Sequence, residues 1–451
     1  MVNRSFKRVL VANRGEIAVR IIGACKKLGI ETVVAVSQAD RDSLPARIAN
    51  RAVCIGAPRA TESYLRPEIL VTAALGTGCE AVHPGYGFLA ERAPFARMCK
   101  DAGVKFIGPS AEAIEAMGEK IAARRLAADA GVPRVPGTDR IDNAAHALTV
   151  AREIGLPVML KASAGGGGRG IRIVRSETEL ANAIEAASAE ASAAFGDSTV
   201  YMEKFIERAK HIEVQVLADA HGNVVHLGER ECSVQRRYQK LIEEAPSPAV
   251  HTALRRDLGR AATELARRVR YEGAGTVEFV FDVDAGRYYF LEMNTRIQVE
   301  HPVTEMITGR DLVAEQIRVA QGTPLTFSQD EIDFTGHAIE CRINAEDPDR
   351  NFTPAPGRLS AFAPPSGHDV RVDTHCFPGY LVPPYYDSLL AKLIVRGADR
   401  AQCIERMRSA LDAFRIEGVP TTIPFHRRVL DHADFQKGRV TTSWVERTLL
   451  P

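Results

Sequence analysis

The chain has 451 residues, of which 45% are hydrophobic and 25% charged, and its formal net charge is +1. This composition is typical of a soluble globular protein with roughly two to four domains. The net charge gives no electrostatic reason to expect a nucleic acid or an anionic membrane as a partner, and no apolar run is long enough to span a bilayer. The eight cysteines stand singly, without a CxxC pair, and the N-terminus lacks a signal-peptide core. We therefore expect neither a zinc site nor disulfides, and a cytoplasmic protein.

The first 115 residues alternate between strand and helix patterns. Residues 9–12 are a short apolar strand, residues 17–28 have helical spacing and residues 32–36 are a second strand. This βαβ order predicts a doubly wound parallel sheet. The loop after the first strand is not GxGxxG, so an NAD-dependent enzyme is disfavoured. The loop at residues 83–91, which contains glycine and proline, either lines a site or is a simple turn.

Residues from about 131 to 205 are predicted to form a small inserted lobe. A glycine-rich loop at residues 162–170 separates two strand-like segments, and Lys161 and Arg169 add positive charge at its two ends. Consecutive glycines expose backbone N–H groups and let phosphate oxygens approach closely. The alternative is a hairpin tip without a function. The loop includes Gly165, Gly166, Gly167 and Gly168.

A hairpin is predicted over residues 275–294, with a three-residue turn at 284–286. In that register Val283 faces Arg287, and Glu278 faces Glu292. Directly opposed carboxylates repel, and a divalent cation between them would turn repulsion into coordination. Two carboxylates and the amide oxygen of Asn294 suit magnesium or manganese. The alternative is a solvated hairpin face with two unrelated glutamates.

Polar side chains alternate along two further segments. If residues 292–300 stay extended, Glu292, Asn294, Arg296, Gln298 and Glu300 share one face, as the wall of a metal- and anion-binding site would require. In the strand that follows residue 336, Glu340 and Arg342 share a face with Asn344. A structural ion pair with Glu340 is the alternative role for Arg342.

Taken together, these segments resemble biotin carboxylases of the ATP-grasp superfamily over nearly the whole chain. The matching segments are residues 12–18, 83–91, 117–120, the glycine-rich loop, 235–245 and 292–308. The resemblance implies an N-terminal βαβ domain at 1–115, an ATP-grasp domain at 116–330 whose lid lobe is the inserted lobe, and a C-terminal domain at 331–451. It also implies that bicarbonate attacks the γ-phosphoryl of MgATP to give carboxyphosphate. Biotin on a carrier is then carboxylated at its ureido nitrogen.

The resemblance assigns a role to each matching residue. ATP would be bound by the four loop glycines and by Lys120, Lys161, Glu203, Lys204, Ile206, His211, Gln235 and Tyr238. Two divalent ions would be held by Glu278, Glu292 and Asn294. Bicarbonate would be bound by Lys240, Arg296, Gln298, the Val299 backbone and Glu300. Glu300 would be the general base, Lys240 and Arg296 would share in catalysis, Arg342 would stabilise negative charge on the ureido oxygen, and Tyr86 would contact biotin.

The sequence departs from the family pattern at Tyr238, where many relatives have histidine, and at Ala164, which replaces a glycine. No lysine is flanked by methionines, so biotin must arrive on another chain, the biotin carboxyl carrier protein. Carboxyltransferase subunits are further expected partners, and homodimerisation is a family expectation. The acceptor expected is acetyl-CoA, with pyruvate, propionyl-CoA or urea as alternatives. Another ATP-grasp ligase, such as a carbamoyl-phosphate or purine-pathway enzyme, and a non-enzymatic regulatory relative are the other classes considered.

Overall fold

The N-terminal part of the chain is a five-stranded parallel sheet with the order β3-β2-β1-β4-β5. The computed structural model describes residues 5–162 and 171–450. Alternate side chains of the sheet enter two hydrophobic clusters, with Val9 and Val11 in one and Leu10 in the other. Burial on both faces explains the unbroken apolar runs of these strands and confirms the predicted doubly wound sheet. The elements are β1 (Arg8–Val11), α1 (Gly15–Lys27), β2 (Glu31–Val36), α2 (Leu44–Ile48), β3 (Arg51–Cys54), α3 (Pro67–Gly76), β4 (Ala81–His83), α4 (Ala93–Asp101), β5 (Lys105–Phe106) and α5 (Ala111–Gly118).

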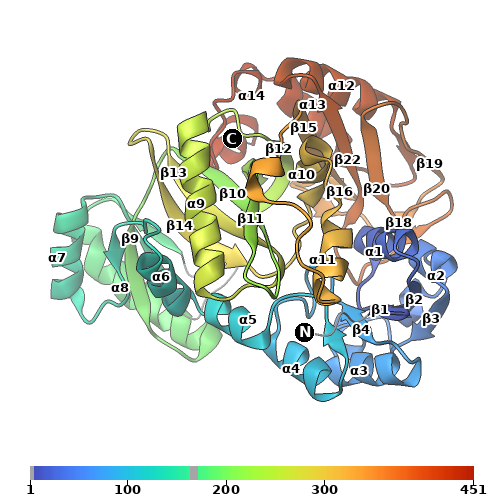
Figure 1. The fold of residues 1–451 in the computed structure, drawn as a ribbon. Helices are drawn as coiled ribbons and strands as arrows, with labels where there is room; N and C mark the ends of the chain where they lie inside the picture. The colour runs from blue at the N-terminus through green and yellow to red at the C-terminus, as the bar shows by residue number, and fades with distance from the viewer. Residues whose placement is uncertain (1–4, 163–170, 451) are drawn as a thin grey trace.

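A small lobe projects from the body of the molecule (Figure 1). After α6 (Lys120–Asp129) it consists of a four-stranded sheet, in the order β6-β9-β7-β8, and two helices. The predicted glycine-rich lid, with Gly165, Gly166, Gly167, Gly168 and the Ala164 departure, lies outside the described residues. The elements of the lobe are β6 (Gly137–Thr138), α7 (Ala144–Ile154), β7 (Val158–Ala162), β8 (Arg172–Val174), α8 (Glu177–Phe195) and β9 (Val200–Lys204).

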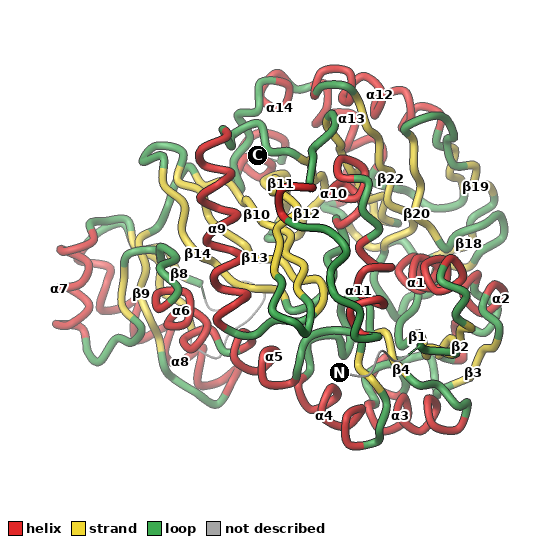
Figure 2. Tube along the Cα trace, viewed as in Figure 1, coloured by secondary structure: helices red, strands yellow, loops and turns green. Residues whose placement is uncertain are grey.

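An eight-stranded antiparallel sheet, in the order β14-β13-β10-β11-β12-β15-β22-β20, forms the centre of the molecule. Figure 2 shows α9 (Thr252–Arg268) in front of its strands. The sheet continues from the central region into the C-terminal region, so residues from both reach one surface. Its strands are β10 (Ala209–Ala218), β11 (Val224–Arg236), β12 (Gln239–Ala245), β13 (Gly273–Asp282), β14 (Arg287–Asn294), β15 (His337–Asn344), β20 (Val370–Thr374) and β22 (Leu389–Gly397).

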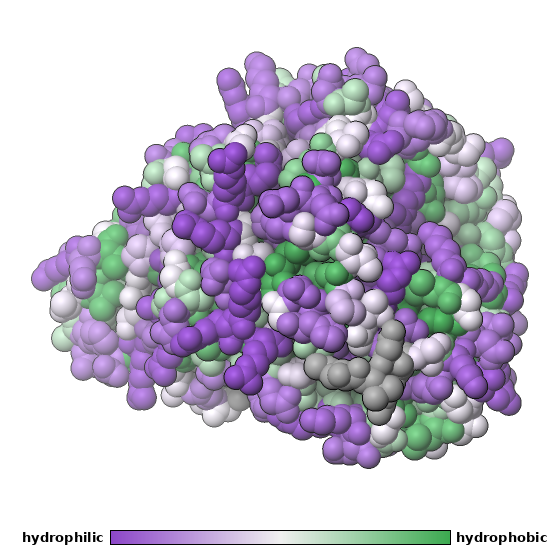
Figure 3. Space-filling model, viewed as in Figure 1, coloured by the Kyte–Doolittle hydropathy of each residue, from purple (hydrophilic) through white to green (hydrophobic). Residues whose placement is uncertain are grey.

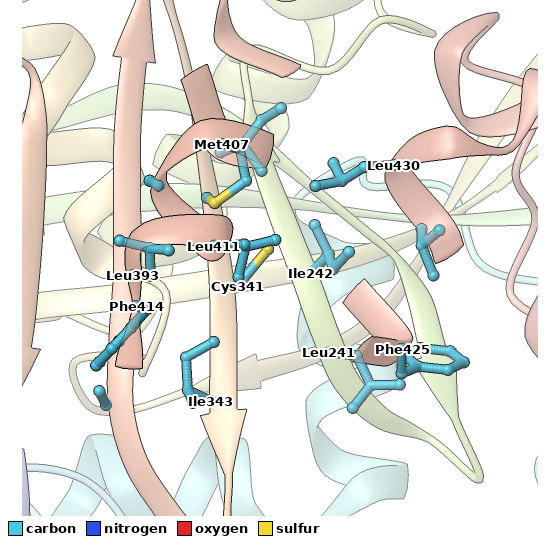
Figure 4. Close-up of a cluster of buried hydrophobic side chains, with 14 of the residues drawn as sticks. Leu241, Ile242, Cys341, Ile343, Leu393, Met407, Leu411, Phe414, Phe425 and Leu430 are labelled. Carbon is cyan, nitrogen blue, oxygen red and sulfur yellow. The ribbon is translucent and has the colours of Figure 1, made fainter. Parts of the chain in front are cut away.

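The largest described hydrophobic cluster fixes the C-terminal end of this sheet (Figure 4). Cys341 and Leu393 of the sheet pack against Met407 and Leu411 of a covering helix. Because this core lies behind β15 and β22, those strands are rigid supports for side chains on their other face. The other α-helices are α10 (His301–Thr308), α11 (Leu312–Ala320), α12 (Arg400–Ala413), α13 (Ile423–Asp431) and α14 (Ala433–Gln436), and the other strands are β16 (Glu346–Asp347), β17 (Thr353–Pro354), β18 (Gly357–Arg358), β19 (Ala361–Ala363), β21 (Leu381–Val382) and β23 (Arg415–Glu417).

Hydrophilic residues predominate on the face shown in Figure 3, with smaller hydrophobic groups between them. Among the described residues, no helix combines the length and the apolar character needed to cross a membrane. All eight cysteines are free, in agreement with the predicted lack of disulfides.

The predicted hairpin exists, but its turn is wrong by one residue. Asp282 pairs with Arg287, so the turn has four residues, and the Asp282 carboxylate accepts hydrogen bonds from two backbone N–H groups within it. A β-bulge at Leu291 then absorbs the extra residue, because Phe279 pairs with Phe290 while Glu278 still pairs with Glu292. The predicted pairing of the two glutamates is therefore correct for a reason the sequence pattern did not contain.

The condition for a single row of polar side chains, that residues 292–300 stay extended, is not met in the structure. Strand β14 ends at Asn294, an irregular segment follows, and helix α10 begins at His301. The polar side chains of this segment therefore do not form one row on a strand.

Candidate active site

A cavity of about 1430 Å³ lies where the N-terminal part, the lobe and the central sheet meet. Ordinary ligand pockets measure about 300–1,000 Å³, so this cavity has room for a nucleotide and a second substrate. It brings together every site residue predicted from the sequence that the structure describes. These residues are Tyr86, Lys120, Lys161, Glu203, Lys204, Ile206, His211, Gln235, Tyr238, Lys240, Glu278, Glu292, Asn294, Arg296, Gln298, Val299, Glu300 and Arg342.

Glu300 lies at one end of the cavity between two cations. Its side chain is fully buried, with one oxygen 2.8 Å from Lys240 Nζ and the other 2.9 Å from an Arg342 nitrogen. Burial alone would raise the pKa of Glu300, but the charges of Lys240 and Arg342 outweigh it and hold the pKa well below its usual value. Glu300 is therefore an ionised carboxylate at neutral pH.

Lys240 connects three carboxylates. Its Nζ lies 2.5 Å from Glu213, 2.9 Å from Glu278 and 2.8 Å from Glu300. Burial opposes the charge, yet these carboxylates raise the pKa of Lys240 well above its ordinary value. One ammonium therefore links the Glu300 end of the cavity to the glutamate pair of the hairpin.

The pKa values of the two hairpin carboxylates shift in opposite directions. Burial would raise the pKa of Glu278, but Lys240 and His211 lower it strongly. Glu292 faces the cavity, where loss of hydration and the charge of Glu278 raise its pKa. Asn294 donates a hydrogen bond of 2.9 Å to Glu278. Two paired carboxylates and an amide oxygen make a hard-oxygen donor set, and the repulsion felt by Glu292 is what a bound divalent cation would relieve.

Arg296 is held in place by three side chains. It donates to Glu91 at 2.8 Å, to Gln298 at 2.6 Å and to Asn294 at 3.1 Å. Gln298 in turn donates to Glu278 at 3.0 Å. Although residues after Asn294 leave the sheet, this network returns the guanidinium and the amide to the cavity beside the glutamate pair.

The lobe end of the cavity carries a second ionic group. Lys161 lies 2.5 Å from Glu203, and Arg124 also pairs with Glu203. Lys204 donates to the backbone carbonyls of Gly155 and Leu156. The Lys204 ammonium thus secures the lobe in this structure and does not point freely into the cavity.

Tyr238 lies in a strained turn at the cavity wall. It is 62% exposed and, with Arg237, forms the two-residue connection between β11 and β12. Both residues have positive φ angles, 66° and 47°, which glycine or asparagine adopts more readily. Glu446 accepts a hydrogen bond of 2.7 Å from the Arg237 N–H and supports this conformation.

The structure does not show the alternative contact considered for Arg342, and it adds residues that the pattern missed. Arg342 contacts Glu243 and Glu300, so the alternative of an ion pair with Glu340 is not observed. The missed residues are Glu16, Glu91, Arg124, Glu213, Arg230, Glu243 and Lys392. Two of them carried a signal in the sequence: Glu213 lies on an alternating strand, and Lys392 interrupts an apolar run.

Comparison with known proteins agrees with this architecture. Family models match three consecutive segments: "Biotin carboxylase, N-terminal domain" at residues 5–114, "Carbamoyl-phosphate synthase L chain, ATP binding domain" at 119–328 and "Biotin carboxylase C-terminal domain" at 340–447. Biotin carboxylase 1 of Bacillus subtilis is 55% identical over 441 residues, which are 98% of each chain. A pyruvate carboxylase subunit from Methanothermobacter thermautotrophicus is 52% identical and covers 98% of this chain and 90% of its own.

Solved structures give the same result. Biotin carboxylase from Campylobacter jejuni superposes with a TM-score of 0.94 at 46% identity, covering 98% of this chain and 99% of its own. The biotin carboxylase domain dimer of 2-oxoglutarate carboxylase from Hydrogenobacter thermophilus, in complex with MgADP, ADP and bicarbonate, has a TM-score of 0.92 at 50% identity and covers 98% and 97%. Fold and cavity thus define a three-domain enzyme of the ATP-grasp class. Within this class, the chain belongs to the biotin carboxylase family, which confirms the resemblance seen in the sequence. The domain boundaries at 115/116 and 330/331 stay a prediction.

Proposed function

We propose that this protein carboxylates biotin with ATP and bicarbonate, through carboxyphosphate. The observation that carries the proposal is Glu300, a buried carboxylate held between Lys240 and Arg342 at one end of a cavity large enough for two substrates. A non-enzymatic relative would have no use for a buried base, a metal-type carboxylate pair and an anion-binding arginine in one cavity. The family membership supports the same activity.

Bicarbonate binds among Lys240, Arg296, Gln298 and the Val299 backbone, and Glu300 takes its proton. An arginine fork matches a planar oxyanion. Lys240 holds the pKa of Glu300 low, which by itself makes the carboxylate a weak base. A bound anion shares the charge of Lys240, so the pKa of Glu300 rises toward a useful value when the substrate is present.

ATP occupies the lobe end of the cavity. Lys120, Lys161 and the loop glycines contact its phosphates, and Glu203, Lys204, Ile206, His211, Gln235 and Tyr238 surround the rest of the nucleotide. Glu278, Glu292 and Asn294 would hold two Mg²⁺ or Mn²⁺ ions, which neutralise the triphosphate and orient the γ-phosphoryl. Support comes from the paired carboxylates and the raised pKa of Glu292.

Biotin reaches the site on a separate biotin carboxyl carrier protein, with Tyr86 and Arg342 at its ureido ring. Arg342 stabilises negative charge on the ureido oxygen. A carboxyltransferase then passes the carboxyl group to an acceptor, for which we propose acetyl-CoA. The alternative acceptors are pyruvate, propionyl-CoA or another acyl-CoA, and urea. Relatives named as pyruvate and 2-oxoglutarate carboxylases are the reason to retain such alternatives. We further propose a cytoplasmic homodimer, which the relative described as a dimer supports.

The first test is ADP release by the purified protein with MgATP and bicarbonate, with and without biotin. We expect release that requires bicarbonate and is stimulated by biotin. Bicarbonate-dependent release that is indifferent both to free biotin and to biotin on a carrier would point to another ATP-grasp ligase. No turnover under any of these conditions would favour a regulatory protein.

Replacing Glu292 by glutamine is expected to raise the Mg²⁺ concentration for half-maximal ADP release by about 10-fold or more. The reason is that one anionic oxygen donor is lost opposite Glu278. A Mg²⁺ titration at saturating ATP measures the effect. Glu264→Gln, on the exposed surface of α9, is the control and should leave the titration unchanged. Equal Mg²⁺ requirements in wild type and Glu292→Gln would remove Glu292 from the metal site.

A further inference from the structure

Lys392 is a fully buried lysine for which the activity described above gives no role. It lies on β22 within the apolar run of residues 389–395, and its side chain is 0% exposed. Its Nζ donates a hydrogen bond of 2.9 Å to the Val299 carbonyl and lies 3.2 Å from Glu16. A third neighbour, Asp373 at 3.8 Å, is already held by Arg371 through two contacts. Burying an ammonium group costs free energy, so the groups that Lys392 contacts indicate its role.

Three parts of the chain meet at this ammonium. Lys392 comes from the C-terminal region, Glu16 from the first turn of α1 and Val299 from the irregular segment before α10. The second oxygen of Glu16 accepts a hydrogen bond from the Tyr86 hydroxyl. A continuous chain of contacts thus runs from Tyr86, through Glu16 and Lys392, to the backbone immediately before Glu300.

The sheet adds a second connection. Lys392 of β22 lies directly opposite Arg342 of β15. Like charges in directly opposed positions repel. The Lys392 ammonium is neutralised on its own side by Glu16, while the Arg342 guanidinium turns to Glu243 and Glu300. The charge of Lys392 therefore favours the orientation of Arg342 that brings it to Glu300.

We propose that Lys392 is a positioning residue for the carboxylation reaction. Its hydrogen bond to Val299 holds the Val299–Glu300 segment on the bicarbonate side of the cavity. Its contact with Glu16 holds Tyr86 on the biotin side. Both substrates are thereby bound in a fixed relative position. The inference rests on the proposed function. A general base must lie within hydrogen-bond reach of its proton, and a small displacement of a reacting group is expensive in rate.

Lys392→Met tests the proposal, because methionine keeps the length and removes the charge and the donor. We expect kcat/KM for bicarbonate to fall about 10- to 100-fold and KM for biotin to rise. The ATP dissociation constant should stay within about twofold, because the contacts of Lys392 among the described residues are with Val299, Glu16 and Asp373, none of which belongs to the lobe. Steady-state ADP release and calorimetric ATP binding measure these quantities.

A double variant separates positioning from folding. Lys392→Met combined with Glu16→Gln removes the ammonium together with its carboxylate, so the buried charges remain balanced and the melting temperature should recover. Catalysis should not recover, because the Val299 carbonyl still lacks its donor. Lys105→Met breaks a different interdomain ion pair, to Glu272, that does not line the cavity, and should leave kcat/KM unchanged.

Each outcome bears on the proposal. Recovery of both stability and kcat/KM in the double variant would show that Lys392 is only structural and would overturn it, as would wild-type kinetics in Lys392→Met. If Lys392→Met does not fold, Glu16→Gln alone is decisive: a raised KM for biotin supports the chain of contacts, and an unchanged KM overturns it. A wild-type protein without biotin-stimulated, bicarbonate-dependent ADP release would instead overturn the proposed function, and this inference with it.

Discussion

Glu300→Gln is expected to lower kcat for biotin-dependent ADP release by about 10²- to 10⁴-fold, the usual contribution of a general base. Glutamine keeps the shape of the side chain and cannot accept the bicarbonate proton. ATP affinity should change little, because the contacts of Glu300 are with Lys240 and Arg342, at the end of the cavity away from the lobe. Steady-state kinetics and ATP binding to the same preparation measure both quantities.

The control for this prediction is the fold of the variant. Glu300 is fully buried between two cations, so its loss leaves Lys240 with two carboxylates and Arg342 with one. Lys240 thus remains neutralised by Glu213 and Glu278, and a loss of activity should come with an intact melting transition. Parallel losses of ATP binding and turnover would mean that Glu300 is a structural residue.

The sequence predicted which residues meet in the cavity better than it predicted how they meet. Glu278 and Glu292 pair as expected, but a longer turn and a bulge at Leu291 cancel each other to give that register. A bulge is a local choice of the backbone that tertiary packing stabilises, and single-sequence periodicity carries no signal for it. Likewise, Arg296 reaches the cavity after the strand has ended, through Glu91, which is distant in sequence.

The site residues that the sequence analysis missed are mostly charged residues that are buried in the folded protein. Arg230, Glu213 and Lys392 lie on strands of the central sheet, and each is fully buried with partners from other parts of the chain. Composition rules place charged residues on the surface, so the basic and acidic stretch around Arg236 and Glu243 is predicted as solvated. In the folded chain Arg236 and Glu243 are buried, because Asn351 and Arg342, far apart from them in sequence, are their partners, whereas Arg237 between them is exposed.

Arg342→Ser is expected to reduce biotin carboxylation by about 10²- to 10³-fold, as the loss of a charge-stabilising donor does elsewhere. The slow bicarbonate-dependent cleavage of ATP without biotin should fall much less, because Lys240 and Arg296 remain. Carboxybiotin formation and ADP release, measured on one preparation with and without biotin, separate the two effects. Arg342→Lys keeps the charge without the planar fork and should lie between serine and wild type.

The loss of Arg342 also changes the ionisation of the neighbouring carboxylates Glu243 and Glu300. Burial raises the pKa of Glu243 to about 7, Arg342 opposes that rise, and Glu300 adds to it. Without Arg342 the pKa of Glu243 rises further, so a larger fraction of Glu243 is protonated at neutral pH and its repulsion of Glu300 decreases. Glu300 also loses the charge of Arg342, but Lys240 and Arg230 still lower its pKa, so the defect should lie mainly in the biotin-dependent reaction. Equal losses in the biotin-free and biotin-dependent reactions across the pH range would assign Arg342 to the bicarbonate step instead.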